Sequence, residues 1–110
     1  AASGASYHGR VGQSASSAGE GCFVGMARPA APDLAALNIR VYTIASGLID
    51  TPLLALLPEP ARDSLSASVL YPKRLGIPDD YASLVMHMVE NNYLNGEVIR
   101  LDGGIRMPPK

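Results

Sequence analysis

Two strand-like segments separated by about fifty residues constrain the fold of this chain more than any other feature. Residues 39–44 (IRVYTI) are rich in β-branched and aromatic side chains, which favours a strand that ends at Ser46-Gly47. Residues 97–101 (EVIRL) are the second expected strand. The long connection between them carries helical patterns, and such connections join parallel strands. Because parallel sheets usually have more than two strands and are buried on both faces, the chain is predicted to be part of a larger α/β sheet.

Helices are predicted between and before these strands. Residues 78–90 begin with a proline and two aspartates, where the helix dipole favours negative charge, and continue with apolar residues at helical spacing. A shorter helix is expected over residues 59–66. Residues 23–38 also contain a helical face, made of Phe23, Val24, Met26 and Leu34 among others. Pro32 should break a helix there, at a cost of about 3 kcal/mol.

Composition excludes several classes of protein. A chain of 110 residues allows one small domain, and its 47% of hydrophobic residues exclude an intrinsically disordered chain. The net charge of −1 argues against a nucleic-acid partner. Apolar runs such as 53–57 are too short to span a membrane, and the N-terminus lacks the features of a signal peptide. The single cysteine, Cys22, excludes an internal disulfide, and a cytoplasmic location is expected.

Two segments resemble the short-chain dehydrogenase/reductase (SDR) family, nearest to its type 2 3-hydroxyacyl-CoA dehydrogenase branch. They are residues 39–53 (IRVYTIASGLIDTPL) and 94–104 (LNGEVIRLDGG), and the similarity continues through Ile105-Arg106-Met107. The resemblance implies a partial Rossmann-like α/β fold with two parallel strands and a helical crossover. It also implies that this is the C-terminal half of the family's domain, without the N-terminal nucleotide-binding half. In this interpretation residues 1–22 are a loop-like, degenerate active-site segment, and residues 23–110 are helix-strand-helix-strand.

The family's catalytic unit is a serine, a tyrosine and a lysine. The lysine lies one helical turn after the tyrosine and lowers the pKa of its phenol, which is ordinarily about 10. By the resemblance, Ser3 matches the catalytic serine, whereas Ser16 stands at the tyrosine position and Glu20 at the lysine position. A serine hydroxyl titrates far above a phenol, and Glu20 reverses the charge. We therefore expect negligible activity of the family type.

The resemblance also implies NAD as the cofactor. Gly47, Ile49 and Thr51 match the loop that wraps the nicotinamide, although a turn after a strand would use the same residues. The family's glycine-rich loop, which holds the pyrophosphate at a helix N-terminus, has no counterpart, since Gly4, Gly9 and Gly12 are not expected to follow a strand. Leucines 53, 54, 56 and 57 resemble the acyl-chain lid, or form a plain apolar helix.

Three functions remain open. The first is an inactive remnant of the enzyme family. The second is a non-catalytic partner that pairs with an intact homologous SDR subunit through the last strand and residues 78–91. The third is a small α/β binding domain. No metal site is expected, because His8 and His87 lack further ligands at a suitable spacing, and Cys22 has no paired base that would make it a nucleophile.

Overall fold

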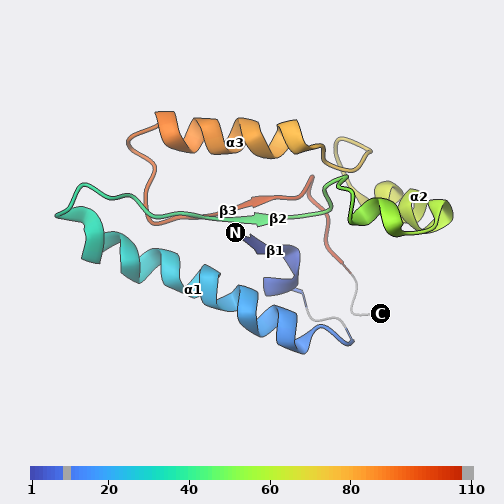
Figure 1. Ribbon diagram of the computed structural model, residues 1–110, viewed down its shortest axis with the longest axis horizontal. Coiled ribbons are helices and arrows are strands. Elements are labelled where there is room, and N and C mark those ends of the chain that lie inside the picture. Colours follow the sequence, from blue (N-terminus) through green and yellow to red (C-terminus); the bar gives the residue numbers. More distant parts are fainter. Residues whose placement is uncertain (9–10, 108–110) are drawn as a thin grey trace.

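Three short parallel strands and three α-helices make up the computed structural model, which describes residues 1–8 and 11–107. The elements follow the order β1 (Ala2–Ser3), η1 (Gly4–Ser6), α1 (Ser14–Ala35), β2 (Thr43–Ser46), η2 (Leu54–Leu56), α2 (Glu59–Ser68), α3 (Pro78–Glu90) and β3 (Val98–Leu101), as Figure 1 shows. Among the described residues, no helix is both long and apolar enough to cross a membrane.

The sheet has the order β1-β2-β3, and both pairs are parallel. Ser3 is in register with Ser46, and Ser46 with Leu101, so all three strands end at the same edge. The parallel pairing expected for the two predicted strands is confirmed. The additional strand β1 was not predicted, because two residues are too few to give a periodic pattern.

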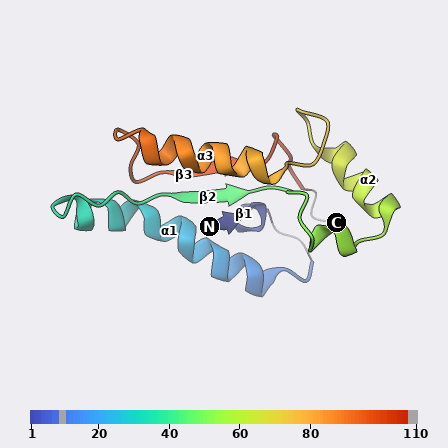
Figure 2. The same cartoon turned by 45° about the horizontal axis from the view of Figure 1, so that its top comes forward.

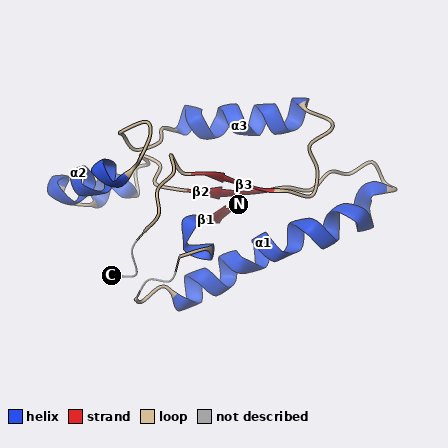
Figure 3. Cartoon of the chain, turned by 180° about the vertical axis from the view of Figure 1, so that it is seen from behind, coloured by secondary structure: helices blue, strands red, loops and turns tan. Residues whose placement is uncertain are grey.

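Helices cover both faces of the sheet. In Figure 1 and from behind in Figure 3, α1 lies on one side and α3 on the other, while Figure 2 shows α2 beyond the carboxyl ends of the strands. The small side chains of Ala27 and Ala31 are buried, which lets α1 approach the sheet closely. The hydroxyl of the buried Thr43 donates to the Phe23 carbonyl of α1 at 2.9 Å. The buried core therefore lies along β2.

The loop predicted for residues 1–22 is wrong for its second half, and the boundary expected at 22/23 lies inside α1. This helix begins at Ser14 and continues through Pro29 and Pro32 to Ala35. The predicted break at Pro32 does not occur. Both prolines are on the exposed side of α1, where water can bind the carbonyls that lose an intrahelical partner.

The apolar face predicted for this helix is only partly correct. Val24 and Leu34 are half-buried, whereas Phe23 and Met26 remain 45% and 51% exposed. The buried residues Ala27 and Ala31 define the inward side instead. Small residues carry little hydropathy signal, so the sequence pattern pointed toward the larger exposed side chains.

The first predicted strand, 39–44, is shifted toward the C-terminus, because β2 spans Thr43–Ser46. Residues before it make other contacts. The Val41 N–H donates to the Asn95 side chain at 2.8 Å. The Arg40 guanidinium donates to the carbonyls of Met88, Val89 and Asn91, each at 2.8 Å. Arg40 thus satisfies carbonyl groups that the end of α3 leaves without helical partners.

The other predicted elements agree closely with the structure. Helix α3 has the predicted bounds, and α2 begins where expected but ends at Ser68, two residues later than the predicted 66. Strand β3 begins one residue later than predicted. Gly4, expected to lie outside any strand context, directly follows β1 but opens the 3-10 helix η1. Gly9 lies outside the described residues.

Replacement of Gly103 by alanine tests the turn after β3. Gly103 has a φ of +58°, and an added Cβ would lie 2.5 Å from the Cγ1 atom of the buried Val69. We expect Gly103→Ala to lower the free energy of unfolding by about 1–3 kcal/mol. Gly19→Ala in α1 is the matched control, since nothing lies within 4 Å of the added atom. It should raise stability by about 0.5–1 kcal/mol. Denaturant unfolding measures both, and equal effects of the two variants would contradict the proposed cause.

Acid titration tests the start of α3. Hydrogen bonds from the Arg74 guanidinium and from the Ile77 backbone N–H lower the pKa of Asp80 to about 2. Because the folded-state pKa is lowered, this stabilisation is complete above the ordinary pKa near 3.8 and is lost as the pH falls toward 2.

Carboxyl NMR shifts should give a midpoint near pH 2 for Asp80, and Arg74→Gln should move that midpoint upward. The control is Arg62→Gln, since Arg62 pairs with Asp50 at 2.7 Å and does not contact Asp80. A midpoint that stays the same in Arg74→Gln would show that this ion pair does not set the pKa.

Candidate functional site

Three positions singled out in the sequence meet beside the end of β1. The Ser3 hydroxyl donates a short hydrogen bond to Glu20 Oε2, and the Ser16 hydroxyl donates to Glu20 Oε1 at 3.4 Å. Ser3 ends β1, whereas Ser16 and Glu20 lie one turn apart on α1. The strand and the helix therefore bring together the residues that the resemblance aligns with the catalytic serine, tyrosine and lysine.

The electrostatics of this cluster differ from those of a serine-tyrosine-lysine unit. An ionised carboxylate only accepts hydrogen bonds, whereas the lysine ammonium of the family only donates them. The Glu20 carboxylate accepts the hydrogen bond of the Ser3 hydroxyl, so in this arrangement the hydroxyl does not donate to another oxygen. Tyr7, the aromatic residue nearest to Ser3 in the sequence, faces the Arg100 guanidinium, with 4.8 Å between the guanidinium carbon and the ring centroid. The cluster thus holds no phenol in place of Ser16.

A small cavity of about 120 Å³ lies next to Ser3. Its lining includes Ser3, Ser46, Gly47, His8 and Arg100. This volume is well below the 300–1,000 Å³ typical of ligand sites. Glu20, which stands at the lysine position, lacks the ammonium donor that the resemblance implies for the nicotinamide ribose of NAD.

The three residues predicted to contact a cofactor have structural contacts of their own. The Gly47 N–H donates to the Leu101 carbonyl at 2.9 Å, and a Cβ at Gly47 would lie 2.6 Å from the Asp102 Cβ. Ile49 forms a parallel bridge with Gly76. The Thr51 hydroxyl oxygen accepts from the Leu54 N–H at 3.3 Å and so begins η2. Only Gly47 shares a cavity with Ser3.

The leucines after this loop are mostly exposed. η2 spans Leu54–Leu56, and Leu53 and Leu56 are among the most exposed apolar side chains in the described part of the chain. They form a short 3-10 turn rather than the plain apolar helix that was the alternative to a lid.

One charged cluster was not found from the sequence. Asp102 is 7% exposed and accepts from Arg100 at 2.6 Å and from Arg106 at 3.2 Å. Arg100 also contacts the His8 ring nitrogen at 3.0 Å and covers the ring of Tyr7. Residues 7–8 and 100 lie more than ninety positions apart, so no local pattern could indicate this contact.

The remaining candidates, Cys22 and the histidines, make structural contacts in the part of the chain that the structure describes. Within residues 1–8 and 11–107, no three His, Cys, Asp or Glu side chains gather into a group that could hold a metal ion. Cys22 is exposed, and its thiol contacts the Ala18 carbonyl at 3.4 Å. His87 contacts Asn91 at the end of α3.

Comparison with known proteins identifies the family. The Enoyl-(Acyl carrier protein) reductase family model matches residues 3–106. The 3-hydroxyacyl-CoA dehydrogenases type-2 of Bos taurus and Drosophila melanogaster are 56% and 52% identical over 108 residues, which is 98% of this chain. The chain spans only 41% and 42% of their lengths. A 3-oxoacyl-[acyl-carrier-protein] reductase FabG of Thermotoga maritima is 35% identical over 100 residues, covering 89% of this chain and 40% of that protein.

A solved structure agrees with these sequence relatives. The crystal structure of 3-hydroxyacyl-CoA dehydrogenase type-2 from Mycobacterium avium matches 99% of this chain and 42% of its own, with a TM-score of 0.94 and 43% identity. The partial Rossmann-like fold predicted from the sequence is therefore confirmed. The chain belongs to the short-chain dehydrogenase/reductase family and corresponds to part of a 3-hydroxyacyl-CoA dehydrogenase type-2.

Proposed function

We propose that this chain is a catalytically inactive relative of the NAD(P)-dependent short-chain oxidoreductases. The observation that carries the proposal is the hydrogen bond from Ser3 to Glu20, beside a serine at the tyrosine position. In the family, a phenol transfers a proton while hydride moves to or from the nicotinamide. Neither a serine hydroxyl nor an engaged carboxylate replaces that phenol, because the first is too weak an acid and the second too weak a base.

The size of the loss follows from the chemistry. General acid–base catalysis contributes about 10²–10⁴-fold, and residues that act as a unit lose most of their effect when one is removed. Glu20 adds an electrostatic penalty, since its negative charge opposes the formation of an anionic oxygen nearby. Turnover of a 3-hydroxyacyl-CoA substrate should therefore be negligible.

The second candidate function is a non-catalytic partner of an intact homologue. The outer side of α3 carries exposed apolar residues, among them Met86 at 54% and Val89 at 59% exposure. Strand β3 lies at the edge of the sheet beside this helix, and no other strand of the described residues 1–8 and 11–107 pairs with its outer side. An exposed apolar helix next to an open sheet edge favours association with another protein chain.

An activity assay tests the first proposal. The purified chain, mixed with a 3-hydroxyacyl-CoA and NAD, should produce NADH at the background rate, as followed by absorbance. The intact Bos taurus relative is the positive control. Replacing its aligned tyrosine and lysine by serine and glutamate should lower kcat by about 10²-fold or more. NADH production by the wild-type chain clearly above background would refute the proposal.

Co-expression with an intact homologue tests the second candidate function, that of a non-catalytic partner. The wild-type chain should co-purify with it, and Met86→Lys combined with Val89→Lys should abolish co-purification, because each lysine would have to be buried without a partner charge. Ala61→Lys with Ala67→Lys is the control, because it adds the same charge at two exposed positions of α2, away from α3. Equal recovery of the homologue with both double variants would exclude this surface as the contact.

A further inference from the structure

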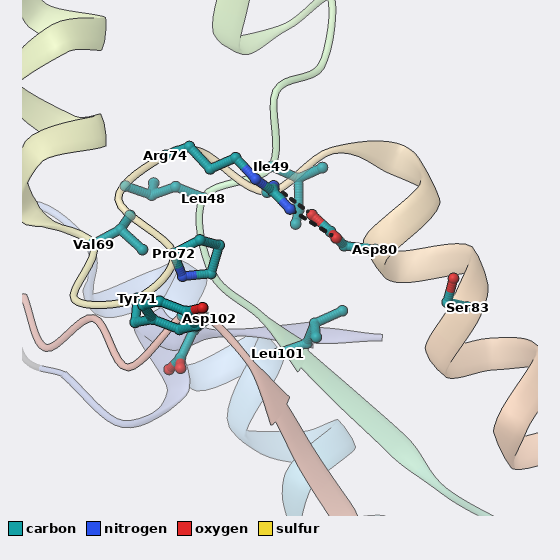
Figure 4. Close-up of a pocket in the computed structure, with 12 residues that line it drawn as sticks. Leu48, Ile49, Val69, Tyr71, Pro72, Arg74, Asp80, Ser83, Leu101 and Asp102 are labelled. Atoms are coloured by element: carbon teal, nitrogen blue, oxygen red, sulfur yellow. Dashed lines mark hydrogen bonds and ion pairs between the residues drawn. The ribbon is translucent and has the colours of Figure 1, made fainter.

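A second and larger cavity lies on the opposite side of the sheet from Glu20. It has a volume of about 320 Å³ and is enclosed by the loop after β2, the connector 69–76 and the start of α3 (Figure 4). Leu48 lines both this cavity and the small one beside Ser3. We propose that the larger cavity binds a small, neutral, mainly apolar molecule. This proposal goes beyond the proposed function and does not rest on it.

The walls of the cavity are preformed. The Leu70 and Tyr71 N–H groups donate to the Gly103 carbonyl at 3.1 and 3.0 Å, which holds one end of the connector against the turn after β3. The Gly76 N–H donates to the Leu48 carbonyl at 2.9 Å, which holds the other end against the loop after β2. A ligand therefore meets a shaped site and does not have to open one, as is usual for cavities that bind small molecules.

The lining selects an apolar ligand. Leu48, Ile49, Val69 and Leu101 contribute aliphatic groups, and Figure 4 shows the Pro72 ring on the connector side. A volume of about 320 Å³ is at the small end of the range for ligand sites, which suits a single or fused ring better than a long chain.

The charges around the cavity exclude an ionic ligand. Asp80 accepts from Arg74 at 2.7 and 3.1 Å, and these two side chains close one rim of the cavity in Figure 4. Asp102 is neutralised by Arg100 and Arg106. Each carboxylate that lines the cavity is thus already paired with a guanidinium, so the lining offers no unpaired carboxylate to an ionic ligand.

Two residues at the rim complete the site. Tyr71 lines the cavity but is 84% exposed, so its ring has a free surface on which a ligand ring can pack. Ser83, on the second turn of α3, places a hydroxyl at the opposite rim. This arrangement favours an aromatic molecule with one hydrogen-bonding group, for which indole is a suitable probe.

Titration of the whole 110-residue chain with indole, followed by ¹³C-methyl NMR, tests the proposal. The methyl signals of Leu48, Ile49, Val69 and Leu101 should shift and saturate, while that of Leu37, which does not line the cavity, should not. Benzoate, an anion of similar size, should bind at least about tenfold more weakly than indole, because its charge would lie in the cavity without a free partner.

A substitution that fills the cavity can be compared with one that adds the same side chain outside it. Ser83→Phe should occupy the cavity from an exposed helix position and weaken indole binding about tenfold or more, by displacing the ligand from the apolar lining. Ala82→Phe adds the same ring to the neighbouring exposed position, which does not line the cavity, and should leave binding unchanged. In the titration, the proposal would be overturned by methyl signals without native dispersion, by shifts that do not saturate, or by benzoate binding as tightly as indole. In the variants, it would be overturned if Ser83→Phe and Ala82→Phe changed indole binding equally.

Discussion

Parallel pairing of β2 with a strand on each side is the constraint on which the rest of this structure depends. Because parallel strands point the same way, Ser3, Ser46 and Leu101 end in register at one edge of the sheet. The turns that follow all lie there, and so do both cavities. Helix α1 supplies Ser16 and Glu20 to one side of that edge, and α3 supplies Asp80 and Ser83 to the other.

At the cluster of Ser3 with Glu20, the backbone resembles that of the family, whereas the side chains at the tyrosine and lysine positions differ. A TM-score of 0.94 shows that the backbone of the matched part is kept, and a strand end still faces a turn of α1 as the resemblance implies. The difference lies in the chemical groups, a hydroxyl at Ser16 and a carboxylate at Glu20. A hydroxyl–carboxylate contact at a half-buried site satisfies both polar groups, so the fold tolerates it. The same contact removes the donor that a substrate oxygen would need.

The sequence predicted the elements whose stabilising interactions lie within a short stretch of the chain. Helix α3 could be predicted to the residue, because a proline, two aspartates and the spacing of apolar residues all occur within its own thirteen positions. The first half of α1 could not, since its serines and glycines have low helix propensity and the contact of Glu20 with Ser3 joins two separate segments. The position of Ser3 near Glu20 was implied by family resemblance, whereas the contact of His8 and Tyr7 with Arg100 joins distant segments and gave no local signal.

The segments that resemble the family make structural contacts within this chain. Gly47 is needed where its backbone approaches Asp102, and Arg40 satisfies carbonyl groups at the end of α3. Thr51 begins η2. Each of these contacts joins residues of the chain itself, so the segments 39–53 and 94–104 that resemble the family have a structural role in this fold. Ser16 and Glu20, which stand at the tyrosine and lysine positions, take part in none of these contacts. The residues that hold this part of the fold and the residues that would move a proton are therefore separate sets.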